Sequence, residues 1–474
     1  MNARPPDVLP NILLIVCDQQ RYDCLGRSRQ YPVRTPCLDR LAEQGAWFSN
    51  AYTPIPLCTP ARQALLNGRR PEAFGGLWNY GTGMPVGALE PEEYAWPRDL
   101  ADCGYQSAYI GKWHVHPVHD PTRYGYGRYI PEEDYHRYRA EKYPDVWFGK
   151  PDWLKNGWFG EIDPVRTEDS LTHWMAKQAT DILDEFARGT QPWHLRIDFT
   201  APHLPCTPVE EFAGLYSADS IPAWRSFGED FINKPYIQKQ QLYTWGVQNY
   251  TWADWSKTAA FYYGLISQTD DAIGRILDRL DQLGQTRGTL VIYTADHGDM
   301  CGGHRMMDKH YVLYDDVVHV PLILRWPGVI APQTAIDDFV SNILDLPPTI
   351  LEAIGRQPRE FFHGRSLMPL LQGERPDDWR QEIVSTYNGQ QLGLYTQRMI
   401  RTRRWKYIWN ATDIDELYDL AADPDELRNL IGDGEQEAIL AELRRRLYEI
   451  LIREGNEFVR NSWLGEQFLH NQKI

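Results

Sequence analysis

The chain has 474 residues, 42% of them hydrophobic, and carries a formal net charge of −16 at pH 7. This length accommodates one large domain and a smaller one. The acidic balance argues against a nucleic acid partner, because a polyanion needs a basic surface. No apolar run reaches the ~18 residues of a membrane-spanning helix, so we expect no membrane association.

The N-terminal residues and the cysteines predict the same compartment. The first ten residues lack the hydrophobic stretch of a secretory signal peptide, and a strand is predicted directly after them. The seven cysteines are odd in number and include no Cys-x-x-Cys pair, which fits a reducing compartment and disfavours structural zinc. We therefore expect a cytoplasmic protein whose cysteines, apart from Cys58, mostly pack in the interior.

The almost unbroken apolar runs at 11–17 and 289–293 indicate a sheet buried on both faces, and four short segments in all are predicted to be strands. They are residues 11–17, 105–110, 193–199 and 289–293. Each is followed closely by polar side chains, namely Asp18 and Gln19, Lys112 and His114, His203, and Asp296 and His297. One such residue alone is more often a turn residue. Because ligands bind beyond the carboxyl ends of parallel strands, four such endings predict one shared site.

Helical patterns lie between these strands. Residues 35–45 combine an N-cap threonine, a proline at the first helical position, apolar spacing and a closing glycine. Residues 259–283 carry apolar side chains on one helical face and stop at Gly284. The alternation of strands and helices predicts an α/β fold, with a parallel sheet covered by helices on both sides.

The segment Leu57-Cys58-Thr59-Pro60-Ala61-Arg62 places a thiol, a proline and a fixed cation at the start of a predicted helix. Pro60 suits a first helical position, and the free N–H groups there favour a bound anion. Arg62 adds a charge that does not titrate. Taken alone, the pattern also fits a helix start that happens to contain Cys and Arg. The polar strand endings favour the anion site.

This segment, with Leu65-Leu66-Asn67-Gly68-Arg69 after it, resembles the signature of the sulfatases. The resemblance continues in order from Asp18 to the C-terminal region, so the chain is identified as a member of that family. It implies the alkaline phosphatase-like fold: a large, mostly parallel sheet sandwiched by helices, with a smaller C-terminal antiparallel sheet. It also implies that a formylglycine-generating or anaerobic sulfatase-maturating enzyme converts Cys58 to formylglycine, whose hydrated aldehyde supplies the nucleophilic oxygen.

The resemblance also assigns roles to single residues. It implies metal ligands at Asp18, Gln19, Cys58, Asp296 and His297. It implies catalytic roles for Cys58, Arg62, Lys112, His114, His203 and Lys309. Gln19 and His297 depart from the Asp and Asn that are commoner in the family. Oxygen ligands suit calcium or magnesium and an imidazole favours manganese, so we expect one divalent cation, with calcium preferred.

The implied reaction is hydrolysis of a small-molecule sulfate ester of an organic alcohol, sugar or phenol. The cation, the arginine and the lysines neutralise the sulfate oxygens. Asp296 helps to activate the attacking hydroxyl, and His203 or Lys309 protonates the leaving alcohol. His114 takes a proton from the second hydroxyl of the hydrated aldehyde, which releases sulfate.

Two alternatives stay open. A phosphonate monoester or phosphodiester hydrolase shares this nucleophile and fold; Gln19 and His297 favour it, whereas Gly111-Lys112-Trp113-His114 favours a sulfatase. The second alternative, a metal-binding protein whose Cys58 is never converted, is disfavoured by the full set of acids, lysines and histidines. Three further residues near the motifs are weighed equally as substrate contacts and as structural residues: Asn79, His304 and His310.

Two segments rich in aromatic residues, 115–170 and 207–258, are interpreted as insertions. They form either a pocket wall or lid that selects the alcohol, or loops whose aromatic residues anchor them or form an oligomer interface. Of the run His114-Val115-His116-Pro117-Val118-His119, we assign only His114 to chemistry.

The pattern changes near residues 367–378, so we place a catalytic domain at 1–375 and a C-terminal α+β subdomain at 376–474. The subdomain is predicted to contain short strand-like pieces, at 398–402, 405–409, 416–420 and 423–430, and a helix from about 434 to 454. The apolar residues of the tail 458–474 predict that it is docked on the protein or on a neighbouring subunit. The sequence leaves open whether the chain is a homo-oligomer.

Overall fold

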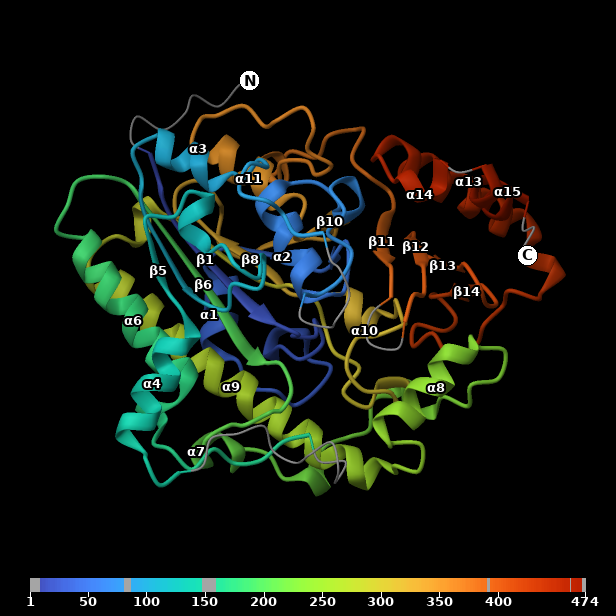
Figure 1. Ribbon diagram of the computed structural model, residues 1–474, viewed down its shortest axis with the longest axis horizontal. Coiled ribbons are helices and arrows are strands. Elements are labelled where there is room, and N and C mark those ends of the chain that lie inside the picture. Colours follow the sequence, from blue (N-terminus) through green and yellow to red (C-terminus); the bar gives the residue numbers. More distant parts are fainter. Residues whose placement is uncertain (1–8, 81–86, 147–158, 390–392, 461, 471–474) are drawn as a thin grey trace.

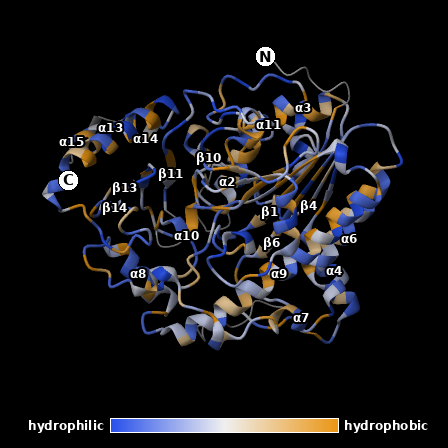
Figure 2. Ribbon diagram, turned by 180° about the vertical axis from the view of Figure 1, so that it is seen from behind, coloured by the Kyte–Doolittle hydropathy of each residue, from blue (hydrophilic) through white to orange (hydrophobic). Residues whose placement is uncertain are grey.

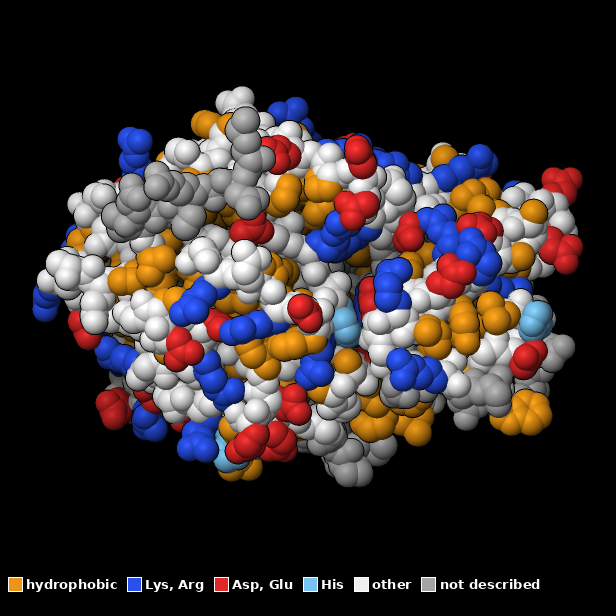
Figure 3. Space-filling view, turned by 90° about the horizontal axis from the view of Figure 1, so that it is seen from above, with side chains coloured by type: hydrophobic (Ala, Val, Ile, Leu, Met, Phe, Trp, Pro, Cys, Tyr) orange, Lys and Arg blue, Asp and Glu red, His pale blue; other side chains and the backbone are white. Residues whose placement is uncertain are grey.

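The structure is a computed structural model that describes residues 9–80, 87–146, 159–389, 393–460 and 462–470. Within these ranges it contains a large eight-stranded sheet, a two-stranded sheet and a four-stranded C-terminal sheet (Figure 1). Over the same ranges, no helix is both long and apolar enough to cross a membrane. Acidic and basic side chains are intermixed on the face shown in Figure 3.

The large sheet has the order β5-β4-β6-β1-β7-β8-β2-β9. Its strands are β1 (Asn11–Asp18), β2 (Ala46–Phe48), β4 (Gln106–Gly111), β5 (Arg128–Ile130), β6 (Trp193–Pro202), β7 (Thr289–Ala295), β8 (Leu322–Arg325) and β9 (Thr334–Ile336). The strands from β5 to β7 are parallel, and β8 runs antiparallel to both of its neighbours. The four predicted strands are therefore neighbours, as β4, β6, β1 and β7, and their carboxyl ends share one edge.

The central strand β1 explains why the sheet is apolar on both faces. Successive side chains of a strand point to opposite faces. The even-numbered residues of β1 join the core on one face, and the odd-numbered residues join the core on the other: Ile12, Leu14 and Val16 against Leu13, Ile15 and Cys17. An unbroken apolar run is the pattern that this double burial requires.

Helices cover both faces of the sheet. One core contains side chains of α1 (Pro36–Glu43), α6 (Leu171–Phe186) and α9 (Trp252–Gln282). The other contains side chains of α2 (Cys58–Asn67), α3 (Pro97–Asp102) and α11 (Leu346–Ala353). Figure 2 shows hydrophobic and hydrophilic residues alternating along α6 and α9, as expected for helices with one buried face. The predicted α/β architecture is confirmed.

The segment 207–258 is more helical than predicted. It contains α7 (Glu210–Ala213), α8 (Tyr236–Trp245) and the first turns of α9. Helix α9 begins at Trp252, well before the predicted position 259, because Thr251 and Asp254 form a capping box. In the segment 115–170, the described residues include β5 and α4 (Glu132–Lys142). Its tryptophans at 147, 153 and 158 lie outside the described residues.

The C-terminal sheet is an antiparallel meander of β11 (Ile383–Tyr387), β12 (Gln397–Arg401), β13 (Trp405–Asn410) and β14 (Glu416–Asp419). Sequence reasoning missed β11. The prediction of a strand-like piece at residues 423–430 was wrong, because these residues form turns and loops. Helix α13 (Glu437–Arg453) packs its leucines on this sheet, as predicted. Further short elements are β3 (Ala51–Tyr52) and β10 (Val340–Ser341), which pair in parallel, and the helices α10 (Asp315–Val318) and α12 (Met368–Leu371).

The C-terminal tail is docked on its own chain, as one of the two predicted arrangements required. It forms α14 (Glu457–Arg460) and α15 (Ser462–His470). Phe468 is fully buried and stacks on Trp409 of β13 at a ring-centroid distance of 4.4 Å. The domain boundary at residue 375 stays a prediction.

Candidate active site

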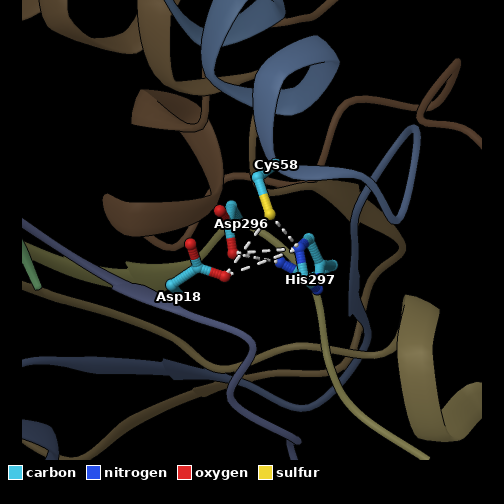
Figure 4. A group of neighbouring side chains, drawn as sticks. All are labelled: Asp18, Cys58, Asp296 and His297. Atoms are coloured by element: carbon cyan, nitrogen blue, oxygen red, sulfur yellow. Dashed lines mark hydrogen bonds and ion pairs between the residues drawn. The ribbon is translucent and has the colours of Figure 1, made fainter. Parts of the chain in front are cut away.

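Four side chains converge at the carboxyl edge of the large sheet (Figure 4). Asp18 ends β1, Asp296 and His297 follow β7, and Cys58 is the first residue of α2. One ligand atom from each lies within 4.8 Å of the others, and at most 1% of any of these residues is exposed. Cys58 Sγ is 3.2 Å from His297 Nε2 and 3.6 Å from Asp18 Oδ1.

The start of α2 places the thiol. The helix begins at Cys58 itself, with Leu57 as the N-cap. Pro60 is therefore the third residue of the helix, and the prediction that it occupies the first helical position was wrong. The backbone N–H of Thr59 donates to Asn79 Oδ1 at 2.8 Å. Asn79 therefore satisfies one of the free N–H groups of the helix start, which is a structural role.

Arg62 connects three carboxylates. Its guanidinium lies 2.5 Å from Asp198 Oδ2, 3.2 Å from Asp18 Oδ2 and 2.9 Å from Asp296 Oδ2. Arg196 holds Asp198 in turn, through two hydrogen bonds of 2.7 Å. Although burial opposes it, these carboxylates raise the pKa of Arg62. Arg62 thus fixes the orientation of both acidic residues of the cluster.

Sequence reasoning missed Asp198. The available signal was a charge inside a strand that is otherwise buried on both faces, because an acid there is almost never without a partner. Only the fold shows that Arg62 is a partner of Asp198 in addition to Arg196.

Two lysines flank the cluster. Lys112 forms an ion pair with Asp18. Lys309 Nζ contacts Gln19 Oε1 at 2.6 Å, His203 Nε2 at 3.1 Å and Asp308 Oδ1 at 3.3 Å. Because Nδ1–H of His203 donates to the Leu204 carbonyl at 2.6 Å, its Nε2 is the acceptor for Lys309. His203 and Lys309 thus form one hydrogen-bonded pair.

Gln19 faces away from the four clustered side chains. Its amide nitrogen donates to Asp299 Oδ2 at 2.5 Å and to Asp308 Oδ1 at 2.9 Å, while its amide oxygen accepts from Lys309. A ligand role for Gln19 stays a prediction, and it requires the amide to turn. Asp299 and Asp308 are supporting residues that sequence reasoning did not assign, although both lie beside predicted site residues.

The cluster carries a shortage of positive charge. Burial lowers the pKa of His297, but Asp296 and Cys58 outweigh it and raise that pKa to about 9. Burial and the charge of Asp18 raise the pKa of Asp296. Against burial, Lys309, Lys112 and His297 hold the pKa of the Cys58 thiol well below its ordinary value. A proton on His297 thus compensates charge that a bound cation would also compensate.

The donor set fits a divalent cation. Nδ1–H of His297 donates to the Gly298 carbonyl at 2.9 Å, which leaves the Nε2 lone pair to face the carboxylates once that nitrogen is deprotonated. Carboxylate oxygens suit calcium and magnesium, and the imidazole adds manganese as a candidate. The cluster therefore has the ligand types, the burial and the unmet charge of a metal site.

His114 lies beside the cluster, at the edge of a cavity of about 400 Å³ that Lys112 also lines. Burial and the charge of Lys112 lower the pKa of His114, although its contact with Cys58 opposes the shift. A larger cavity of about 880 Å³ is lined mainly by side chains from 341–384, with others from 69–73 and from the end of α13, and none of the predicted catalytic residues lines it. The chemistry of the side chains, and not cavity size, locates the site.

Two family models match the chain, the Sulfatase model over residues 10–356 and the N-sulphoglucosamine sulphohydrolase C-terminal model over residues 302–453. The chain belongs to the sulfatase family. As a sulfatase it is a sulfuric ester hydrolase, and the resemblance stated from the Cys58 motif is confirmed.

Two similar sulfatases illustrate the match. The uncharacterized sulfatase YidJ of Escherichia coli is 29% identical over 94% of this chain and 86% of its own length. An arylsulfatase of Clostridium perfringens is 28% identical over 94% of this chain and 95% of its own length. The crystal structure of a phosphonate monoester hydrolase of Agrobacterium radiobacter superposes with a TM-score of 0.80, at 23% identity over 94% of this chain and 96% of that one. The alkaline phosphatase-like fold is thereby confirmed.

Two other histidines of this sulfatase lie outside the cluster. His304 Nδ1 contacts Glu229 at 2.8 Å, and its ring stacks on Tyr314 at 3.9 Å. His310 Nε2 lies 3.0 Å from Asp308 Oδ2, behind Lys309. Both have the buried partners of structural residues, and His310 additionally supports Asp308. A substrate contact at either position stays a prediction.

Proposed function

We propose that this sulfatase cleaves sulfate monoesters of an alcohol, sugar or phenol after Cys58 has been oxidised to formylglycine. The observation that carries the proposal is the place of Cys58, in the sulfatase motif and against Asp18 and His297. Its Sγ marks the position of the side-chain oxygen that formylglycine would carry. Maturation requires a formylglycine-generating or anaerobic sulfatase-maturating enzyme as a partner.

Asp18, Asp296, His297 and the modified residue 58 would hold the divalent cation, with Gln19 as a further candidate ligand. Calcium is our preferred ion, and manganese and magnesium are the alternatives. When bound, the cation supplies positive charge that stabilises the sulfate oxygens as the ester bond breaks. Arg62 keeps the two carboxylates in place through the ion pairs described above.

Lys112 and Lys309 bind the sulfate group. Burial lowers the pKa of each lysine, but Asp18 beside Lys112 and Asp308 beside Lys309 outweigh it, so both pKa values are raised. Both ammonium groups therefore remain charged at neutral pH. They provide fixed donors for an anion in a site from which water is largely excluded.

Proton transfer is assigned to the two sides of the cluster. The hydrogen-bonded pair of Lys309 and His203 delivers the proton to the leaving oxygen, so the two residues share the role for which the sequence offered either one. His114, whose pKa is lowered, is neutral at pH 7 and can accept a proton from the hydroxyl of residue 58. The site thus provides a proton donor, the Lys309–His203 pair, and a proton acceptor, His114, for the same reaction.

The second candidate function is phosphonate monoester hydrolysis. The overlap with the Agrobacterium radiobacter enzyme supports a shared fold and leaves the substrate open. Lys112 and His114 favour sulfate, because a lysine and a histidine suit its compact anion, whereas related phosphonate hydrolases carry neutral hydroxyl residues there.

A combined measurement separates these functions. The mass of the peptide that contains Cys58 is measured together with initial rates on an aryl sulfate and an aryl phosphonate monoester at equal concentration. We expect the mass change from thiol to aldehyde and faster hydrolysis of the sulfate. Faster hydrolysis of the phosphonate would establish the second function instead. An unmodified, inactive protein that stays inactive after co-expression with the maturing enzyme would disprove the formylglycine mechanism.

The Cys58→Ala variant tests the nucleophile directly. We expect the rate to fall about 1,000-fold or more while the melting temperature stays near that of the wild type. The matched control is Cys103→Ala, which removes a partly exposed thiol that, within the described residues, accepts a hydrogen bond from Arg356. Wild-type turnover by Cys58→Ala would refute the assignment.

A further inference from the structure

The cavity beside Lys112 and His114 has a wall that the reaction itself does not need. The described residues that line this wall include two tyrosines and three acids: Tyr80, Tyr129, Asp120, Glu132 and Glu133. We propose that the cavity receives the alcohol part of the substrate and selects an uncharged, hydroxyl-bearing ring over an anionic one, such as a uronate or a polysulfated sugar. This inference rests on the proposed function and specifies its substrate class.

Tyr80 joins the cavity to the nucleophile. Its ring packs edge-on against His114 at a centroid distance of 4.7 Å. Burial raises the pKa of the Tyr80 hydroxyl, and the charges of Arg62, Glu133 and Cys58 also contribute to that pKa. The cavity therefore begins beside the nucleophile and extends toward the acids, so we assign it to the part of the substrate that projects from the sulfate.

Cations compensate the acids of the wall only in part, because the charges of Lys112 and Arg62 act on Glu132. Glu133 is exposed, and neither it nor Asp120 forms an ion pair within the described part of the chain. Glu132 accepts a hydrogen bond from Thr200 of β6, and burial raises its pKa. Lys112 is the one lysine or arginine among the described lining residues, and it is already paired with Asp18.

His116 does not supply a cation to this wall. His116 Nδ1 accepts hydrogen bonds from the backbone N–H groups of Val118 at 3.0 Å and His119 at 2.9 Å. Burial lowers the pKa of His116, so the ring is neutral with its proton on Nε2, toward Glu90. Although Glu90, His116 and His119 form a cluster of potential ligands, a metal on Nε2 would require His116 to become an imidazolate, because its Nδ1 already accepts two backbone hydrogen bonds. The cluster is better explained as polar lining.

Acids at the start of α4 also have a simpler explanation, because negative charge stabilises a helix N-terminus. That explanation covers Asp134, which pairs with Arg137 on the same helix. The helix N-terminus does not explain why the side chain of Glu132 points toward β6. Nor does it explain why the described cavity wall contains tyrosine rings as well as acids. Tyr129 is held by a hydrogen bond to the Gly111 carbonyl at 3.2 Å, and such fixed rings suit the apolar faces of a sugar or phenyl group.

The test compares two aryl sulfates whose leaving groups differ in charge but little in chemistry. In 4-(hydroxymethyl)phenyl sulfate and 4-(carboxymethyl)phenyl sulfate, a methylene group separates the substituent from the ring. Measured at 0.15 M salt, the neutral ester should have a kcat/KM about tenfold higher, because uncompensated carboxylates repel an anion at short range. In each of the variants Glu133→Gln and Asp120→Asn, the ratio of kcat/KM for the neutral ester to kcat/KM for the anionic ester should fall about threefold.

Glu141→Gln is the matched control. It removes the same charge from the same helix, eight residues and about 12 Å farther along the axis, so the ratio should stay at its wild-type value. Equal kcat/KM for the two esters, or a ratio unchanged in both cavity variants, would overturn the inference. So would an equal change in Glu141→Gln.

Binding of the two product phenols, measured by calorimetry, separates this inference from the proposed function. If neither ester is hydrolysed, the proposed function fails. Tighter binding of the neutral phenol would then still support the acidic wall, and equal or tighter binding of the carboxylate would overturn it.

Discussion

Two buried charged regions of this sulfatase differ in how their charge is balanced. Around Cys58, two carboxylates face a thiol and an imidazole, and the pKa of His297 is raised to about 9. At the junction with the C-terminal sheet, Lys406 pairs with Asp315 at 2.6 Å and Glu426 at 2.5 Å. There, burial and Arg401 lower the pKa of His319 to about 4.

The difference shows what each region needs from outside the chain. At the junction, the lysine and Arg401 already face the two carboxylates, and His319 lies neutral between the rings of Tyr22 and Tyr52 at 3.8 and 4.6 Å. In that region each of the two carboxylates has a basic partner, although burial raises the pKa of Glu426 to about 7. The Cys58 cluster instead raises the proton affinity of its histidine, because part of its negative charge is left for a cation or a substrate-binding group.

The strongest way to break the comparison is to remove the central cation of each region. Arg62→Met and Lys406→Met each leave buried carboxylates without their partner, which should cost about 3–5 kcal/mol of unfolding free energy. Only Arg62→Met should also lower kcat, by about 100-fold or more, because its carboxylates belong to the site. Urea unfolding and steady-state kinetics measure the two effects. A similar loss of kcat in folded Lys406→Met would refute the division.

Metal binding sharpens the comparison with an intermediate effect. Calcium or manganese at about 100 times its dissociation constant should stabilise the wild type by about 2.7 kcal/mol, and a chelator should reverse this. Asp18→Asn should lose most of the increment, because it removes a ligand charge. Lys406→Met should keep it, because the junction holds no part of the metal site. Thermal unfolding with and without the ion checks this, and an equal increment in Asp18→Asn would contradict it.

The smallest expected effect is a pH dependence from the junction. Because the folded pKa of His319 is about 4 and the unfolded value about 6.5, its contribution is present above pH 6.5 and lost as pH falls toward 4. Near pH 5.5 the unfolded chain binds about one more proton at this residue, which adds about 1 kcal/mol per pH unit to the slope of stability. His319→Gln should flatten that slope in urea titrations between pH 5 and 6.5. An unchanged slope would show that His319 is protonated in the fold.

Much of the sheet was predictable from local sequence. Residues 12–17 and 290–293 form unbroken apolar runs, as expected for strands covered on both faces, and they lie in β1 and β7. Helix α1 followed from its proline and apolar spacing. Strand β11 was missed because its sequence, Ile383-Val384-Ser385-Thr386-Tyr387, is short and partly polar. Its polar residues are buried against the loop before Cys58, which no local pattern reveals.

The candidate site divides in the same way. The motif around Cys58 and the polar strand endings identified the residues of the cluster, because parallel strands present their carboxyl ends at one edge. The wall of the neighbouring cavity was not predictable. Tyr80 comes from the segment after α2, Tyr129 from β5 and Glu132 from α4, and their approach depends on how these elements pack.

The sequence by itself determined the family, the positions of the four central strands along the chain and the residue types of the chemistry, because these depend on local hydrophobic pattern and on a specific motif. Only the tertiary structure decided which charges face one another. Arg62 meets Asp198 across 136 positions, and Gln19 meets Lys309 across 290. Coulomb interactions and hydrogen bonds act over a few ångströms of space, and separation along the chain does not reveal which groups come that close.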